Sequence, residues 1–197
     1  MPRQADYPVD PLFLERWSPR AFDGGEIPEA DLLTLFEAAR WAPSAFNSQP
    51  WRFLYARRGE AEWERFLDLL IPFNRSWAQS ASVLIYILSD TLPFTDKAGE
   101  PATSHTHSYD AGAAWACLAL QATRMGYQAH GMSGVDFDRA RRELAVPERY
   151  RIEAAAVVGR IGDRETLPEK LRAREVPSGR KAVEEFVFRG GWPASSP

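Results

Sequence analysis

Apolar positions along the chain fall either at helical spacing or in unbroken runs. Residues 28–41 and 60–70 place their apolar side chains three and four positions apart, which predicts two amphipathic helices. Residues 51–56, 82–88 and 152–161 are apolar segments rich in branched or aromatic residues, which predicts strands. Strands separated by helices predict the α+β class, with α/β as the alternative, around one mixed sheet.

Residues 109–125 predict a further helix that is apolar on almost every side. A helix without a polar face is normally buried. Its alanines and Gly112 would let a second helix approach closely, so the segment indicates a dimer interface. Cys117 lies in the same run, and we interpret this thiol as inert core, because the sequence places no histidine base to activate it.

Shorter segments complete the expected elements. Residues 10–17 predict a short helix capped by Asp10, and residues 74–78 predict a helical turn. Residues 138–144 predict another helix. Residues 182–188 are amphipathic and fit either a helix or an extended arm.

Two polar segments lack a clear period. Residues 92–107 are interpreted as a mobile excursion near a site, because long irregular segments in compact domains are usually functional or disordered. His105 and His107 lie in this segment without a third ligand nearby, so no metal site is predicted. Residues 164–175 are highly charged and are expected to be exposed.

The chain of 197 residues is expected to form a single domain over 1–197, with a core at about 11–187 and a loose tail at 189–197. A net charge of −3 gives no reason to expect nucleic acid or an anionic membrane surface as a partner. The longest apolar run, 111–120, is shorter than the roughly 20 residues that cross a bilayer. A single cysteine and a start without an apolar leader predict a cytoplasmic protein.

The loop between the helix at 28–41 and the strand at 51–56 is the most distinctive polar stretch. Pro43 disfavours helical geometry in the residue before it, and Ser44 and Asn47 carry side chains that hold tight turns. Such a rigid loop can present hydroxyls, an amide and backbone N–H groups to a ligand. It can equally be an ordinary connector between a helix and a strand.

Other polar clusters lie outside that loop. Arg16, Ser18 and Arg20 place two cations around a hydroxyl, which suits a phosphate but also describes solvated surface charge. A turn at 133–134 and a basic turn around Arg180 complete the set. Two basic turns could share one phosphate, and two loops of small residues could bind a heteroaromatic ring. The residues alone therefore indicate an anionic aromatic cofactor.

Common nucleotide and hydrolase motifs are missing from the sequence. No Gly-x-Gly-x-x-Gly follows a strand, and there is no Walker loop, Gly-x-Ser-x-Gly elbow or His-Glu-x-x-His helix. Dedicated dinucleotide and nucleoside triphosphate cradles are therefore not supported.

Taken together and in order, the polar motifs resemble the FMN-dependent nitroreductase family. The resemblance covers about Pro11 to Val187. It is carried by Arg16-x-Ser18-x-Arg20-x-Phe22, Pro43-Ser44-x-x-Asn47-Ser48-Gln49-Pro50-Trp51, Asp110-x-Gly112-x-Ala114 with Gly126, and Ser178-x-Arg180. It implies a three-layer α/β/α fold with a central mixed, mainly antiparallel sheet. It also implies an intertwined homodimer with two FMN sites at the subunit interface.

The resemblance assigns these residues to FMN: Arg16, Trp17, Ser18, Arg20, Pro43, Ser44, Ala45, Asn47, Asn74, Ser133, Gly134 and Arg180. Arg16 and Arg180 match the positions that hold the phosphate, for which guanidinium forks are well suited. Trp17, Ser18 and Arg20 match those along the ribityl chain and the pyrimidine. In that position Arg20 would support the negative charge of reduced flavin.

The remaining assignments come from the ring side and from the second subunit. Asn74 matches an amide donor to the pyrimidine, and Ser133 and Gly134 match a turn whose backbone N–H faces flavin N5 and O4. The stretch Pro43–Asn47 matches the part donated by the other subunit. Trp77 departs from members that carry a lysine there, and Ser133 departs from members with an acidic residue.

The reaction implied by the resemblance is a ping-pong transfer. NADPH or NADH would reduce FMN and leave, and an electron acceptor such as a nitroaromatic or a quinone would take its place. The chemistry belongs to flavin N5, so no catalytic side chain is assigned. Two alternatives stay open: a flavin-binding protein without turnover, and a superfamily member that acts on reduced flavin or on a halogenated aromatic.

Overall fold

The computed structural model describes residues 3–193. Its helices and strands are α1 (Pro11–Glu15), α2 (Glu29–Arg40), β1 (Trp51–Arg57), α3 (Trp63–Asp68), α4 (Pro72–Ala78), β2 (Val83–Asp90), β3 (Phe94–Thr95), β4 (Pro101–Ala102), α5 (His107–Arg124), β5 (Gln128–Met132), α6 (Phe137–Glu143), β6 (Tyr150–Gly159) and α7 (Glu169–Arg172). Short 3-10 turns lie at Ala45–Asn47, Arg164–Thr166 and Val183–Glu185.

The central sheet has four strands in the order β1-β2-β6-β5. Every neighbouring pair in it is antiparallel. This agrees with a mainly antiparallel sheet, and the parallel strand that a mixed sheet would contain is not found among residues 3–193 of one chain. In one chain β1 is therefore an edge strand, with one side of its backbone left without a sheet partner.

A β-bulge interrupts the pairing of β2 with β6. Ile87 pairs with Ala154 and Leu88 pairs with Ile152, so Glu153 is the extra residue. Its Oε1 accepts hydrogen bonds from the hydroxyls of Ser89 (2.5 Å) and Ser108 (2.7 Å). Ser108 lies in the first turn of α5, so the bulge fastens the start of this helix to the sheet.

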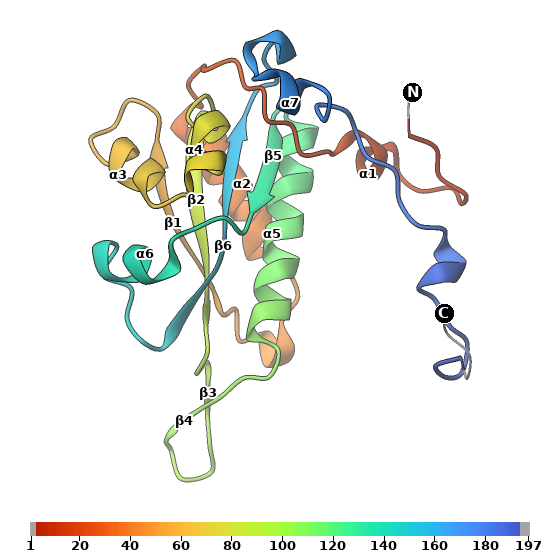
Figure 1. Cartoon of the computed structure of the whole chain (residues 1–197). Helices are drawn as coiled ribbons and strands as arrows, with labels where there is room; N and C mark the ends of the chain where they lie inside the picture. Colours follow the sequence, from red (N-terminus) through yellow and green to blue (C-terminus); the bar gives the residue numbers. More distant parts are fainter. Residues whose placement is uncertain (1–2, 194–197) are drawn as a thin grey trace.

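Helices cover both faces of the sheet, which confirms the three-layer α/β/α prediction (Figure 1). Because side chains alternate along a strand, β2 sends Val83, Ile85 and Ile87 toward α2 and α5 and its other apolar residues toward α3, α4 and α6. All eight residues of β2 are buried, as expected for a strand covered on both faces.

Two segments differ from the sequence prediction, and the structure settles a third that the sequence left open. The excursion at 92–107 is not irregular throughout, because β3 and β4 pair as a small antiparallel hairpin within it. The helix expected at 60–70 is shorter and begins only at Trp63, after a turn. Residues 182–188 contain one 3-10 turn and otherwise extend away from the sheet, beside the N-terminal segment (Figure 1).

The helix α5 is buried along one stripe and not on every side. Ala111, Ala114 and Leu118 pack into the core between α5, the sheet and α2, whereas Gly112 and Ala116 are exposed. Cys117 is partly buried in a single chain and packs against this core. An apolar face of α5 is thus left open within one chain.

None of the helices in residues 3–193 combines the length and apolar character that crossing a membrane requires.

Candidate functional site

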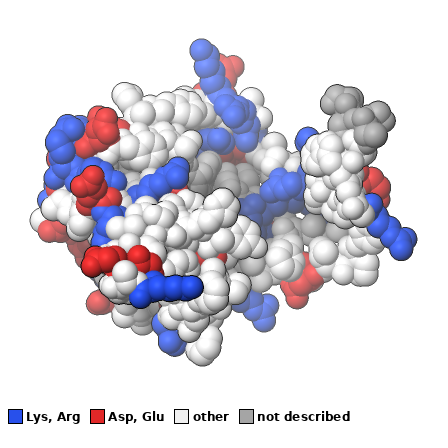
Figure 2. Space-filling model, turned by 90° about the horizontal axis from the view of Figure 1, so that it is seen from below, with Lys and Arg blue, Asp and Glu red and all other residues white. Residues whose placement is uncertain are grey.

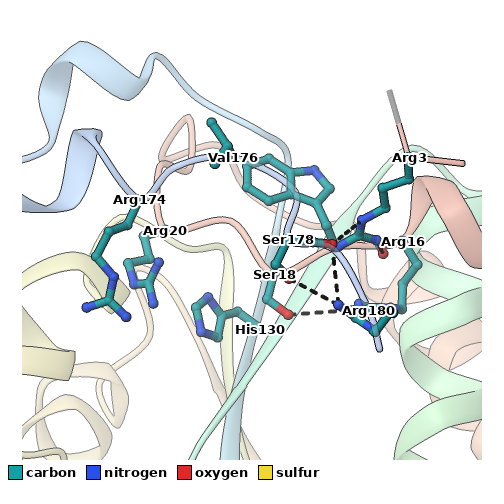
Figure 3. A pocket seen from close by; sticks show the side chains of 10 residues that line it. Arg3, Arg16, Ser18, Arg20, His130, Arg174, Val176, Ser178 and Arg180 are labelled. Atoms are coloured by element: carbon teal, nitrogen blue, oxygen red, sulfur yellow. Dashed lines mark hydrogen bonds between the residues drawn. The ribbon is translucent and has the colours of Figure 1, made fainter. Parts of the chain in front are cut away.

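The segment after α1 is extended and presents its polar side chains together. Asp10 caps α1 by accepting a hydrogen bond from the amide of Leu12, and the helix ends at Glu15. The chain then runs extended, and the amide of Trp17 donates to Oε1 of Gln128 at the start of β5 (3.2 Å). Alternate residues of an extended segment point to the same side, which brings Arg16, Ser18 and Arg20 into one cavity (Figure 3).

This cavity, of about 330 Å³, collects side chains from both ends of the chain. Its lining residues are Arg3, Arg16, Trp17, Ser18, Arg20, His130, Arg174, Val176, Ser178 and Arg180. Five guanidinium groups face it, and no carboxylate is among these lining residues. In the space-filling view of Figure 2, basic side chains gather where the terminal arm joins the body of the molecule.

One group of cations consists of Arg3, Arg16 and Arg180. Nε of Arg3 donates to the carbonyl of Ser178 (2.9 Å), and its Nη1 donates to the carbonyl of Arg16 (2.6 Å). These two bonds join the N-terminal segment, the extended loop and the C-terminal segment. Burial lowers the pKa of Arg16, and the charges of Arg3 and Arg180 lower it further. The group is therefore a concentration of like charge that an anion would stabilise.

The hydroxyls of this group lie between the cations. Nη1 of Arg16 donates to Oγ of Ser18 (3.3 Å), and Nη1 of Arg180 donates to Oγ of Ser178 (3.1 Å). Each hydroxyl keeps its own proton as a donor. Guanidinium and hydroxyl donors converging on one space are the donor set that recognises a phosphate.

A second pair of cations, Arg20 and Arg174, lies on the other side of His130 (Figure 3). The guanidinium of Arg20 lies 5.8 Å from the ring centre of Trp77 on α4. Burial is the main cause that lowers the pKa of Arg20, followed by the charge of Arg174. The cavity therefore has two separate positive poles.

His130 on β5 divides these two poles. Its Nδ1 lies 2.7 Å from the carbonyl oxygen of Pro19, which accepts only if Nδ1 carries the proton, and its ring packs 4.5 Å from that of Trp77. Burial lowers the pKa of His130 to about 4 against the raising effect of the Pro19 bond, and Arg20 and Arg16 lower it further. The imidazole is neutral at pH 7, and Nε2 is free to accept a hydrogen bond.

A second set of predicted residues adjoins the cavity without lining it. The amide Nδ2 of Asn74 donates to the carbonyl of Gly134 (3.2 Å), as does the backbone N–H of Ile71 (3.1 Å). A Cβ at Gly134 would lie 2.3 Å from Asn74 Nδ2, so a larger residue would have to displace this amide. Asn74 thus fixes the turn at Ser133 and Gly134, which follows His130 along the chain.

The predicted loop at 43–47 lies far from the cavity in the same chain (Figure 1). The amide of Ala45 donates to Asp110 in the first turn of α5 (3.2 Å). At the other end of α5, Thr123 donates to the same Gln128 oxygen that Trp17 contacts. Asp110 and Thr123 are about 20 Å apart along the helix axis, so one chain does not join the loop to the cavity.

The loop itself adopts an uncommon conformation. Phe46, Asn47 and Gln49 have φ values of 51°, 55° and 48°, a region that residues other than glycine rarely adopt. Phe46 is 94% exposed. Such conformations persist where the surroundings impose them, and they concentrate at ligand contacts and other functional positions.

The sequence prediction omitted five residues that line the cavity. Arg3, Arg174 and Val176 belong to no motif, and Ser178 was noted in a motif without an assigned role. His130 was given no role, and a histidine beside small residues was the single available signal for it.

Comparison with known proteins agrees with this geometry. The nitroreductase family is matched over residues 14–76, which include Arg16 and Arg20 of the cavity and the loop at 43–47. A solved structure described as an oxidoreductase containing FMN is 48% identical and covers 98% of this chain and 97% of its own, with a TM-score of 0.94.

Curated relatives point the same way. A 15.4 kDa uncharacterized protein of Mycolicibacterium smegmatis is 34% identical over 149 residues, which are 72% of this chain and 97% of that protein. A Rhodopseudomonas palustris protein, named provisionally as an NADH dehydrogenase/NAD(P)H nitroreductase, is 27% identical over 81% of this chain and 87% of its own. With its three layers, its antiparallel sheet and its arginine-lined cavity, this chain belongs to the nitroreductase family.

Proposed function

We propose that this protein is an FMN-dependent oxidoreductase that takes electrons from NADH or NADPH and delivers them to a small organic acceptor such as a nitroaromatic or a quinone. The observation that carries the proposal is the cavity with five guanidinium groups and no lining carboxylate. The 48% identical structure that contains FMN supports the choice of this cofactor.

The cationic group at Arg3, Arg16 and Arg180 fits the phosphate of FMN. A phosphate monoester carries close to two negative charges at neutral pH and accepts several hydrogen bonds at once. The lowered pKa of Arg16 reflects partial burial beside two like charges, a cost that a bound dianion would offset. Ser18 and Ser178 would supply hydroxyl donors between the guanidinium groups.

The pole at Arg20 and Arg174 would face the pyrimidine side of the ring. The guanidinium of Arg20 lies 5.8 Å from the ring centre of Trp77, which gives this charge an aromatic neighbour. His130 lies between the poles with Nε2 as a hydrogen-bond acceptor, suited to a hydroxyl of the ribityl chain. The turn at Ser133 and Gly134, pinned by Asn74, would offer backbone N–H groups to the ring edge.

The side chains around the cavity bind and orient, and none is suited to proton transfer at neutral pH. His130 has a pKa of about 4 and uses Nδ1–H to hold Pro19. When bound, FMN supplies the two-electron chemistry and serves a nicotinamide and an acceptor in turn, which is a ping-pong order. The proton that the acceptor needs would come from water.

A homodimer would complete the site. The loop Pro43–Asn47 lies at the end of α5 remote from the cavity, although it carries Ser44, Ala45 and Asn47, which the family resemblance assigns to FMN. In one chain the edge of β1 has no sheet partner among residues 3–193, and one face of α5 and the side chains of Phe186 and Trp192 on the C-terminal arm are exposed. A second copy that covers these surfaces could bring its own loop to the cavity.

The first test is the purified protein itself. It should be yellow or take up FMN, and NADH or NADPH should bleach the flavin absorbance under anaerobic conditions. A colourless protein that fails to bind added FMN would refute the cofactor. Flavin that binds but is not bleached by either nicotinamide would limit the protein to flavin binding.

A mixing experiment tests the shared site. One chain carries Arg16→Ala and Arg180→Ala, and the other carries Ser44→Gly and Asn47→Gly. Neither homodimer should retain FMN. After unfolding and refolding together, random pairing should restore about a quarter of the sites, because only mixed dimers hold one intact site. No recovery of FMN binding would show that a site does not draw on two chains.

A further inference from the structure

A buried carboxylate lies directly behind the cavity wall. Glu175 falls between Arg174 and Val176, which both line the cavity, yet its own side chain turns inward and is 6% exposed. The sequence prediction of an exposed charged segment at 164–175 is wrong for this residue. A buried acid beside a site for anions has an electrostatic cost, so its contacts matter.

The contacts of Glu175 are to the backbone of the extended loop. Its Oε1 accepts hydrogen bonds from the N–H groups of Arg20 (2.7 Å) and Ala21 (2.8 Å), more than 150 residues away in sequence. One carboxylate oxygen thus satisfies two successive amides of a segment that lies between sheet and solvent. Bonds from a charged acceptor to backbone N–H are among the stronger ones.

The same loop is held from its other side by His130, which donates to the carbonyl of Pro19. Glu175 and His130 therefore form hydrogen bonds with the backbone of three consecutive residues, Pro19, Arg20 and Ala21. The guanidinium of Arg20 makes no equivalent contact, since its buried Nε has no hydrogen-bond partner among residues 3–193. The place of the Arg20 side chain is thus set through its backbone.

We propose that Glu175 is a positioning residue that clasps the Arg16–Arg20 loop to the C-terminal segment and so fixes both positive poles of the cavity. The inference rests on the proposed FMN site. Arg20 depends on the clasp through its own amide. Arg174 depends on it because it directly precedes Glu175, and Ser178 and Arg180 depend on it because they follow in the same segment.

The proposed role depends on the oxygen of Glu175 that accepts the two hydrogen bonds. The negative charge of the same carboxylate lowers the positive potential that the cavity offers to an anion. Oε2 of Glu175 is buried and has no hydrogen-bond partner among residues 3–193. The charge of Glu175 also offsets the positive charge at Arg20, where it acts against the lowering of the arginine pKa by burial and by Arg174. A glutamine would keep the accepting oxygen and remove the charge, so Glu175→Gln and Glu175→Ala separate the two effects.

The test compares FMN affinity in three proteins by fluorescence titration. Glu175→Ala should raise the dissociation constant roughly tenfold to a hundredfold, because two hydrogen bonds to a buried charged acceptor are lost. Glu175→Gln should bind FMN as tightly as the parent or more tightly. Glu169→Ala, an exposed acid at the start of α7, is the matched control and should leave affinity unchanged.

Equal affinity of Glu175→Ala and the parent would overturn the inference. So would a Glu175→Gln variant as weak as Glu175→Ala, because the charge rather than the acceptor would then be responsible. If the parent itself binds no FMN, the proposed function fails and the clasp is judged by the next measurement alone.

Hydrogen–deuterium exchange of the FMN-free parent reads the clasp directly, even if Glu175→Ala does not fold. The amides of Arg20 and Ala21 should exchange at least tenfold more slowly than unprotected loop amides, because Glu175 accepts from both. Glu175→Gln should keep this protection. Exchange at the unprotected rate in the parent would refute the clasp.

Discussion

The two ends of α5 are built in contrasting ways. At the end near β5, side chains from four distant segments converge on one cavity and are fixed by hydrogen bonds between Trp17, Gln128 and Thr123. At the other end, a loop in left-handed conformation exposes Phe46 almost completely. The first end is a cavity lined by side chains that already contact one another. The second end is an exposed loop that lines no such cavity in the same chain. If the proposed shared site is correct, a single chain folds two unlike halves of that site and keeps them apart.

The largest expected effect comes from removing cations from the cavity. A chain with Arg16→Ala and Arg180→Ala should bind FMN at least a hundredfold more weakly, because each lost charge-assisted contact is worth roughly 1.5–3 kcal/mol. Fluorescence titration measures it.

The control for that pair is Arg142→Ala, an exposed arginine on α6 outside the cavity. It should leave affinity unchanged. If the control weakens binding as much as the double variant, general charge and not the cavity attracts the flavin.

A steric change at the turn beside the cavity should have the next largest effect. Gly134→Ala would place a methyl group 2.3 Å from Asn74 Nδ2 and 2.7 Å from Ile71 Cδ1. Relieving that overlap should lower the free energy of unfolding by roughly 1–3 kcal/mol. Urea denaturation measures the loss, and an unchanged midpoint would mean that the turn moves freely.

The histidine between the two poles should make stability depend on pH. The folded-state pKa of His130 is about 4, below its ordinary value of 6.5, so the unfolded chain binds the extra proton first. The stabilising contribution is complete above pH 6.5 and is lost as the pH falls toward 4. The loss should total roughly 2–3 kcal/mol, at up to about 1.4 kcal/mol per pH unit.

Urea denaturation of the parent and of His130→Gln at pH 7, 5.5 and 4.5 measures this dependence. The difference between the two proteins should shrink as the pH falls. A constant difference across these three pH values would contradict a buried neutral imidazole.

The smallest expected effect is that of a substitution at Gly112, which tests whether a second subunit covers the exposed face of α5. Gly112 has nothing within 4 Å of the position its Cβ would take. In an isolated chain Gly112→Ala should therefore raise the free energy of unfolding by about 1 kcal/mol through helix propensity. In a dimer whose second helix packs closely on this glycine, the sign should reverse. Thermal unfolding and sedimentation of the same samples separate the two cases.

Local patterns in the sequence predicted much of the fold. The apolar run of β2 predicted a strand covered on both faces, and the spacing at 28–41 predicted α2, because both signals arise within a few residues. Arg16, Ser18 and Arg20 could be grouped for the same reason, because they lie within five consecutive residues. The structure added that this segment is extended, so that alternate residues share a side. Asp10 could be recognised as the cap of α1 from the proline that follows it.

What escaped prediction depends on contacts between distant segments. His130 lines the cavity because Pro19 and Trp77 hold its ring, and neither is near it in sequence. Glu175 lies among charged residues, so the sequence predicts that it is exposed. In the structure it is buried, because its Oε1 accepts hydrogen bonds from two amides that lie 155 and 154 positions away. The apolar residues of α5 predicted burial on all sides, although one chain covers only one stripe.

The bulge at Glu153 has a mechanical consequence for this arrangement. By holding Ser89 and Ser108 with a single oxygen, it prevents the first turn of α5 from sliding along the sheet, while Gln128 restrains the last turns. Because hydrogen bonds anchor α5 near both of its ends, the helix acts as a spacer of fixed length. The distance between the cavity and the loop is then fixed within one subunit, and in the proposed dimer the second subunit has to match that length.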